Sequence, residues 1–282
     1  MGKIYITADS SVDLTNEILN KYKIQTRPFI VTIGGTSYED GITINPQKLY
    51  EEVKKTNSLP KTAAINVAAY EEFFKNLVAD GSEVIHFNIS SGFSSSYQNA
   101  AIAAEDIEGV YPIDSLNLST GTALLALKAC ELVKEGKTAK EIVGIINGLR
   151  DKVEASFVVD TLDYLYKGGR CSALSALGAN LLKLRPCIEV KDGKMGVGKK
   201  YRGKIEDCFY SYVKDRLDGR DDLDLSRIFI TNSGNVSDET VNEIEKLILE
   251  RAPFAEVLKT TAGCTISSHC GPGTLGILFI RK

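Results

Sequence analysis

Residues 84–105 read VIHFNISSGFSSSYQNAAIAAE, and this stretch is the clearest indication of the fold class. Its first part, 84–89, is a short apolar run typical of a buried strand, and 94–105 has the composition of a helix. Between the two lies a loop of hydroxyl residues around Gly92. Strand, polar loop and helix in this order form the repeating unit of a parallel sheet that is covered by helices.

The same alternation continues on both sides of this unit. Strand patterns lie at 4–8, 29–33 and 109–113, and helical patterns lie at 15–22, 46–55, 68–78, 120–134 and 138–150. This rhythm favours a parallel sheet with helices on both faces. Thr138 and Glu141 stand in the register of a capping box at the start of the last helix.

The pattern changes near residue 153, where strands begin to come in pairs. Strands are predicted at 155–160, 188–190, 195–197, 225–232, 256–260 and 275–280, and helices at 172–184, 205–217 and 238–251. Asp192-Gly193 between two of the strands is a strong hairpin signal. We predict an α/β protein: an N-terminal α/β/α domain with a parallel sheet (1–153), a C-terminal α+β domain (154–282), and a ligand between them.

Composition narrows the class of protein. The 282 residues carry a net charge of −3, which does not indicate a nucleic-acid or membrane surface. No apolar run reaches the roughly 20 residues needed to span a bilayer, and the start shows no secretion signal. The six cysteines form no C-x-x-C pair and there are only two histidines, so a metal site is not expected. We expect a cytoplasmic protein with reduced thiols and no cofactor.

The loop at 90–96 holds five hydroxyl residues in seven positions. Ligands of parallel sheets bind at the carboxyl ends of strands, and N–H groups at a helix start attract a carboxylate or phosphate. Ser is also the preferred N-cap, so the sequence leaves capping and ligand binding equally open. Asp9-Ser10-Ser11 and Asp114-Ser115 also follow predicted strands, and these groups should therefore meet at the same sheet edge.

The second half offers three further features. His269 lies in a loop rich in Ser and Gly, where it is either a hydrogen-bonded structural residue or part of a site. Residues 191–204 carry five Lys and one Arg against one Asp, which indicates a solvated hairpin or a docking surface for an anionic group. The predicted helix at 172–184 is rich in small residues, which could leave room for an acyl chain. No Walker-type loop is present, and the G-x-G-x-x-G match at 271–276 precedes a strand rather than a helix.

Together these segments resemble the DegV family over nearly the whole chain. The matching segments, in order, are Asp9-Ser10-Ser11, Pro60-Lys61-Thr62, Ile89–Ser94, Ile113-Asp114-Ser115, Asp163–Arg170, Leu181–Pro186 and His269–Gly276. The resemblance implies a carrier without catalytic activity that serves a bacterial fatty acid kinase. Such a carrier would hold a long-chain fatty acid with its tail in a hydrophobic tunnel and its carboxylate on hydroxyl groups. The kinase would bind the ATP, and transient contact with a membrane is compatible with the role.

The resemblance also assigns residues. Thr62, Ser94 and His269 fall on family positions at the carboxyl end of the fatty acid, and Arg170 and Arg202 match arginines linked to work with the kinase. The chain departs from the family after Thr62, where it reads Ala63-Ala64-Ile65-Asn66 in place of Ser, Gln and Pro, and after Ser94, where Ser95-Ser96 replaces Gly-Thr.

The backbone N–H groups near Ser95 are also suitable donors to the carboxylate of such a fatty acid. Hydroxyl and N–H donors would then suffice for the head group, without a Lys or Arg to neutralise it.

Two other functions remain open on the sequence. Ser94, Asp160 and His269 follow the chain order of an α/β-hydrolase triad, and Gly92-Phe93-Ser94 sits at a strand-to-helix turn like a nucleophile elbow. Against a serine acyl hydrolase, Ser96 replaces the closing Gly of that motif. The third reading is a binding module for another small carboxylate or phosphate.

Overall fold

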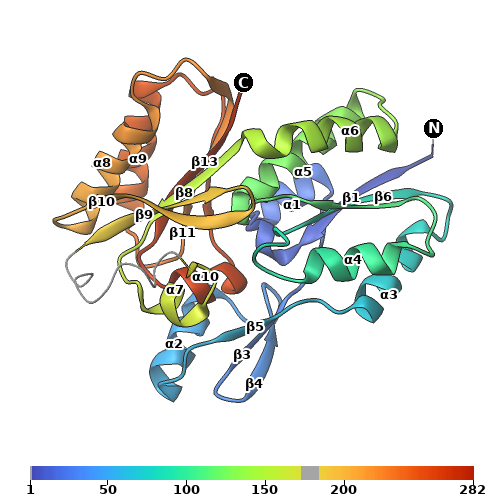
Figure 1. Cartoon of the computed structure of the whole chain (residues 1–282), viewed down its shortest axis with the longest axis horizontal. Helices are drawn as coiled ribbons and strands as arrows, with labels where there is room; N and C mark the ends of the chain where they lie inside the picture. Colours follow the sequence, from blue (N-terminus) through green and yellow to red (C-terminus); the bar gives the residue numbers. More distant parts are fainter. Residues whose placement is uncertain (1, 173–183) are drawn as a thin grey trace.

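The computed structural model describes residues 2–172 and 184–282, and its first half is built on a parallel sheet (Figure 1). The strands β1 (Ile4–Asp9), β2 (Gln25–Arg27), β6 (Glu83–Asn88) and β7 (Val110–Asp114) pair in the order β2-β1-β6-β7. All three pairings are parallel, so the carboxyl ends of β1, β6 and β7 share one edge, as predicted.

Helices cover both faces of this sheet. On one face lie α3 (Val67–Val78) and α4 (Ser96–Ala104), and on the other lie α5 (Ser119–Lys134) and α6 (Ala139–Leu149) (Figure 1). The capping box predicted at Thr138 and Glu141 is formed. Helix α5 is buried along most of its length because it also contacts the sheet of the second half. The shorter α1 (Asn16–Tyr22) follows β1 and the 3-10 turn η1 (Ser10–Val12).

The second half is a mixed six-stranded sheet in the order β10-β9-β8-β13-β11-β12. Its strands are β8 (Val153–Val158), β9 (Arg185–Lys191), β10 (Lys194–Tyr201), β11 (Leu223–Asn232), β12 (Val257–Thr261) and β13 (Leu275–Arg281). The predicted hairpin is confirmed: Asp192 and Gly193 both have positive φ, as a tight two-residue turn between twisted strands requires. Helices α8 (Ile205–Leu217) and α9 (Asp238–Arg251) pack against each other on this half.

Several parts of the structure were not predicted, among them the edge strand β2 of the parallel sheet. The strand predicted at 29–33 is observed as β3 (Ile30–Ile33), but it pairs antiparallel with β4 (Thr36–Glu39) and β5 (Lys61–Ala63) in a small separate sheet. This sheet lies beside α2 (Pro46–Thr56), which was predicted. Two short helices, α7 (Asp163–Gly168) and α10 (Cys264–Cys270), contact each other near this sheet (Figure 1). The helix predicted at 172–184 lies, except for its two ends, outside the described residues.

A 3-10 turn, η2 (Arg150–Lys152), leads into β8, so the predicted boundary at residue 153 coincides with the first strand of the second sheet. The division into two domains stays a prediction, because α10 comes from the second half and contacts η1, β3, β5 and α2 of the first. None of the helices described in 2–172 and 184–282 is long and apolar enough to cross a membrane.

Candidate functional site

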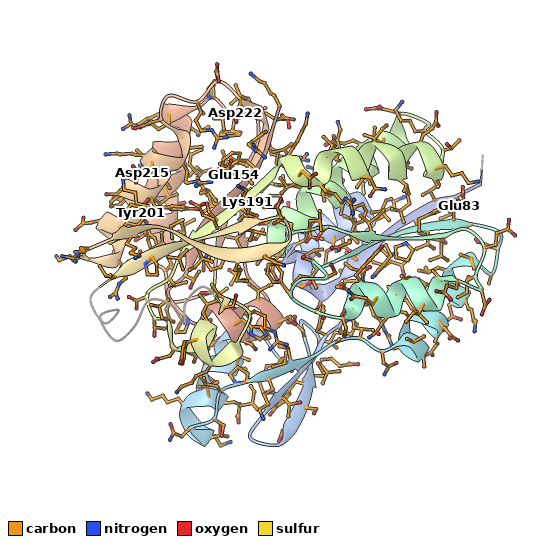
Figure 2. All side chains as sticks on the ribbon, viewed as in Figure 1. Glu83, Glu154, Lys191, Tyr201, Asp215 and Asp222 are labelled. Carbon is orange, nitrogen blue, oxygen red and sulfur yellow. The ribbon has the colours of Figure 1, made fainter. Side chains whose placement is uncertain are left out.

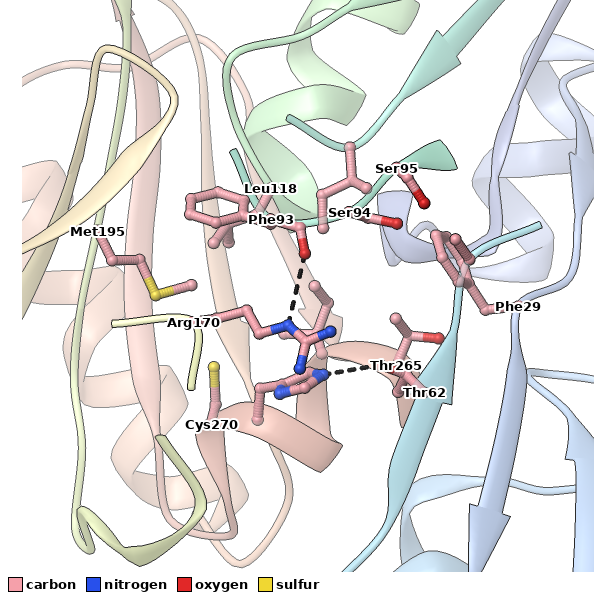
Figure 3. Close-up of a pocket in the computed structure, with 14 residues that line it drawn as sticks. Phe29, Thr62, Phe93, Ser94, Ser95, Leu118, Arg170, Met195, Thr265 and Cys270 are labelled. Atoms are coloured by element: carbon pink, nitrogen blue, oxygen red, sulfur yellow. Dashed lines mark hydrogen bonds between the residues drawn. The ribbon is translucent and has the colours of Figure 1, made fainter. Parts of the chain in front are cut away.

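A cavity of about 190 Å³ lies where the serine loop (residues 90–96), the small antiparallel sheet, α10 and the β9–β10 hairpin meet (Figure 3). Apolar side chains make up most of its wall, and hydroxyl groups, one imidazole and one guanidinium gather within it. The lining residues are Phe29, Thr62, Ala64, Ile89, Phe93, Ser94, Ser95, Leu118, Arg170, Met195, Thr265, Ile266, His269 and Cys270.

The structure brings together all four residues that were assigned to the ligand. Ser94 and Ser95 lie in the loop between β6 and α4, Thr62 lies on β5, and His269 lies on α10. Of the two arginines assigned to the partner, Arg170 lines the cavity as well. Arg202 does not: it is exposed just after the end of β10.

The serine loop leaves hydroxyl groups at the cavity because most of its serines do not act as ordinary helix caps. Helix α4 begins at Ser96, two residues later than predicted, and Ser95 at the N-cap position makes no side-chain cap. Ser94 Oγ accepts from the Ser96 N–H at 3.2 Å and donates to Ser96 Oγ at 3.1 Å. Both Ser94 and Ser95 therefore reach the cavity, beside the first N–H groups of α4 that have no partner inside the helix.

The two acidic residues predicted at this sheet edge, Asp9 and Asp114, do not line the cavity and instead accept hydrogen bonds from the end of β6 and from the loop that follows it. Asp114 Oδ1 accepts from the Ser91 N–H at 3.1 Å. Asp9, which is fully buried, accepts from the Tyr70 hydroxyl at 2.5 Å and from Asn88 Nδ2 at 3.2 Å. Burial raises the pKa of the Tyr70 phenol well above its usual range, so it stays a donor to Asp9. These contacts hold the end of β6 and the start of the serine loop in place.

His269 is joined to Thr62 across the cavity wall. Thr62 Oγ1 lies 2.8 Å from His269 Nε2, and within the described residues His269 Nδ1 has no hydrogen-bond partner. A buried N–H without a partner is rarer in proteins than a buried acceptor without one, so we assign the ring proton to Nε2. Nε2–H then donates to Thr62 Oγ1, and the hydroxyl proton of Thr62 is free to point into the cavity.

Desolvation, and secondly the positive charge of Arg170, lower the pKa of His269 to about 4. We therefore expect a neutral ring at pH 7. The unfolded chain has an ordinary histidine pKa of 6.5, so between pH 6.5 and 4 the unfolded state binds more protons. The free energy of unfolding should fall as the pH drops through this window, by about 3 kcal/mol at most.

Urea unfolding between pH 8 and 4 and ring ¹⁵N shifts measure this effect, and a His269→Gln variant should lose this part of the pH dependence. A ring that titrates near 6.5 in the folded protein would contradict the assignment.

Arg170 adds a cation that sequence reasoning did not place in the cavity. Its Nη1 donates to the Gly168 carbonyl at 2.8 Å and its Nε to the Phe93 carbonyl at 3.5 Å. Within the part of the chain that the structure describes, no carboxylate forms an ion pair with it. A guanidinium thus lines the same cavity as the hydroxyl groups (Figure 3). The expectation that hydroxyl and N–H groups alone hold the head group stays a prediction.

The geometry of a serine hydrolase is not assembled. The imidazole of His269 pairs with Thr62, and Ser94 pairs with Ser96. Asp160, the third candidate, forms an ion pair with Arg185 at 2.9 Å. A triad needs the base bonded to both the nucleophile and an orienting acid. Across residues 2–172 and 184–282 there is also no group of three side chains suited to a metal ion.

A family model and several relatives match almost the whole chain. The model of the DegV family, described as "Uncharacterised protein, DegV family", matches residues 3–282. A DegV domain-containing protein of Clostridium acetobutylicum is 33% identical, and one of Clostridium perfringens is 31% identical; each match covers 100% of both chains.

Solved structures share the fold. A DegV family protein from Thermus thermophilus, titled for fatty acid binding, superposes with a TM-score of 0.89 at 25% identity and covers 99% of this chain and 100% of its own. DegV of Bacillus subtilis, titled a fatty acid binding protein, gives 0.83 at 26% with 100% of each chain. A stearic acid-binding protein from Eubacterium ventriosum gives 0.84 at 26%, with 100% of this chain and 99% of its own. The match of the family model to residues 3–282 and the full-length relatives show that the chain belongs to the DegV family.

Proposed function

We propose that this protein binds one long-chain fatty acid in the cavity and presents its carboxylate to a separate ATP-dependent fatty acid kinase. The observation that carries the binding step is the lining of the cavity: a mostly apolar wall with Thr62, Ser94, Ser95 and Arg170 gathered within it. Such a surface fits a ligand with a long apolar tail and one anionic head. The titles of the similar structures, which name fatty acids, support the same ligand class.

The two ends of the ligand contribute differently. A C16 chain has about 14 methylenes, whose burial at roughly 0.8 kcal/mol each contributes about 11 kcal/mol. Association and ordering cost about 4–15 kcal/mol and offset much of this. The tail therefore supplies affinity, whereas charge-assisted hydrogen bonds of about 1.5–3 kcal/mol each orient the head. Thr62 is the donor best oriented towards the carboxylate, because its oxygen accepts a hydrogen bond from His269 and its hydroxyl proton stays free to donate.

The proposed chemistry takes place on the ligand. A carboxylate oxygen attacks the γ-phosphorus of ATP bound on the kinase, the bond to the β–γ bridging oxygen breaks, and ADP leaves with that electron pair. The product is an acyl phosphate. Arg170 beside the head group would stabilise the transferred charge, as positioned cations do in phosphoryl transfer. The absence of a Walker-type loop in the sequence supports assigning ATP to the partner.

The proposal gives Arg202 a different task from the cavity residues. Arg202 is exposed just after β10, next to the four lysines of the β9–β10 hairpin, so it can contact a partner without touching the ligand. A carrier of this kind would work in the cytoplasm and collect its ligand by transient contact with the membrane.

Separate substitutions test the division of roles. Ser94→Ala should weaken fatty acid affinity about tenfold or more, because one charge-assisted hydrogen bond is lost. Arg202→Ala should leave affinity unchanged and lower acyl phosphate formation with the kinase. Displacement of a fluorescent fatty acid and a coupled kinase assay measure the two quantities. Lys194→Ala, which removes one exposed charge from the same hairpin, is the control for general charge effects. If Arg202→Ala abolished lipid binding, the division would be wrong.

A further inference from the structure

Helix α10 forms one wall of the cavity with a regular stripe of side chains. Thr265, Ile266, His269 and Cys270 all line the cavity. This spacing of one and four residues places them on a single face of a helix. Any rotation or slide of α10 would therefore move His269 relative to Thr62, which lies on β5 of a separate sheet. The contacts that fix α10 consequently decide the geometry at the polar part of the cavity.

The N-terminus of α10 is held by two carboxylates that lie far away in the sequence. Asp40 Oδ1 accepts from the Cys264 N–H at 2.7 Å, and Asp40 Oδ2 accepts from the Thr265 N–H at 3.1 Å. Asp13 Oδ1 accepts from the Gly263 N–H at 2.8 Å. The first N–H groups of a helix have no partner within the helix, so these three bonds satisfy donors that would otherwise be buried without one.

Both carboxylates are buried and are themselves held in place. Asp40 is 3% exposed and Asp13 is 5% exposed. Ser10 Oγ donates to Asp40 Oδ2 at 3.0 Å, and Ser119 donates to Asp13. The contact leaves little space: a Cβ atom at Gly263 would lie 3.1 Å from an oxygen of each carboxylate. Two carboxylates from the first half of the chain, Asp13 and Asp40, thus hold the N-terminus of α10 from the second half in place.

Asp40 is the stronger of the two contacts, because both of its oxygens bind the first turn of α10. We propose that Asp40 is a positioning residue for His269: by capping α10 it sets the imidazole against Thr62, and so directs the hydroxyl proton of Thr62 into the cavity. Asp40 does not line the cavity itself. Its effect on ligand affinity rests on the proposed function, whereas its effect on the His269 ring does not.

The test compares Asp40→Ala and Asp40→Asn with a control at another carboxylate that is mostly shielded from solvent. Glu154→Gln removes a carboxylate charge that is 14% exposed and paired with Arg216 and Arg220, on a part of the six-stranded sheet remote from α10 (Figure 2). This variant should lose stability without moving α10. The chain has only two histidines, so ring ¹⁵N signals are readily assigned with a His86→Gln variant.

In ligand-free Asp40→Ala, the pKa of His269 should rise from about 4 by about one unit or more, because the ring loses part of its burial. Asp40→Asn, which keeps one acceptor oxygen, should show a smaller rise, and Glu154→Gln should show none. Fatty acid affinity should fall about five- to tenfold in Asp40→Ala.

Two outcomes bear on different claims. If the His269 signal and pKa stay unchanged in a folded Asp40→Ala or Asp40→Asn variant, the positioning role is refuted. If they move while the wild-type protein binds no fatty acid, the positioning role stands and the proposed function fails. Should Asp40→Ala not fold, the Asn variant alone decides the question.

Discussion

Ala64→Phe is expected to weaken binding of a C16 fatty acid by about two orders of magnitude while the protein stays folded. Ala64 lines the cavity just after the end of β5. A phenyl ring at this position would therefore fill part of the space in which we propose that the fatty acid tail binds. Excluding about four methylenes would lower affinity roughly 200-fold, at about 0.8 kcal/mol for each. No side-chain hydrogen bond is removed by this change, so the thermal midpoint should stay within a few degrees of the wild type.

Fluorescence displacement with fatty acids of increasing length measures the effect. A short acid that leaves the blocked part of the cavity empty should bind the variant and the wild type almost equally. A folded Ala64→Phe protein with undiminished affinity for hexadecanoate would show that the tail lies elsewhere.

Gly92→Ala should both destabilise the protein and weaken ligand binding. A Cβ atom at Gly92 would lie 2.3 Å from the carbonyl oxygen of Gly193 in the β9–β10 turn, a contact between two backbones that no side-chain rotation can relieve. Ser90 Oγ donates to the same carbonyl at 2.8 Å, so the hairpin turn rests on the serine loop. Forcing the two apart would cost about 1–3 kcal/mol and move Ser94.

Denaturant unfolding and a fatty acid titration measure both effects, and we expect at least a tenfold loss of affinity. Gly196→Ala is the matched control: Gly196 lies on the same hairpin, in β10, and a Cβ atom there would meet nothing within 4 Å. If Gly92→Ala behaved like Gly196→Ala, the contact between loop and hairpin would not matter for the site.

Most of the parallel sheet was predictable because β1, β6 and β7 are largely buried and the helices are long. Its edge strand β2 was not predicted, since it has three residues and none of them is buried. The run at 84–89 and the helix at 120–134 carry clear apolar patterns, and their observed bounds differ from the predicted ones by one residue at most. The tight turn at Asp192-Gly193 was predictable because positive φ at two successive residues strongly restricts residue choice.

Strand β3 of the small sheet was predicted at 29–33, but its partners β4 and β5 were missed because they are short and have no buried residue. β5 has three residues and β4 has none that is buried, so neither shows the alternation by which strands are recognised. Helix α10 was missed for another reason. Its residues are almost all buried, so it lacks the polar face of an amphipathic helix. The spacing of Thr265, Ile266, His269 and Cys270 was the available signal.

The polar residues of the site were found mainly through the family resemblance, and the contacts between them were not predictable. Thr62 and His269 are 207 residues apart, so no local pattern could reveal that their side chains meet at 2.8 Å. Arg170 was expected to serve the kinase partner and the transferred phosphate, and its place in the cavity depends on how the chain runs after α7. Apolar lining residues such as Leu118 and Met195 look like ordinary core in the sequence.

A crystal structure of the purified protein with hexadecanoate would show whether the fatty acid binds in this cavity. We expect continuous density for one extended chain there, with a carboxylate oxygen about 3 Å from Thr62 Oγ1 and from a donor of the Ser94–Ser95 segment. A cavity that stays empty at saturating ligand, or a carboxylate bound far from Thr62, would contradict it.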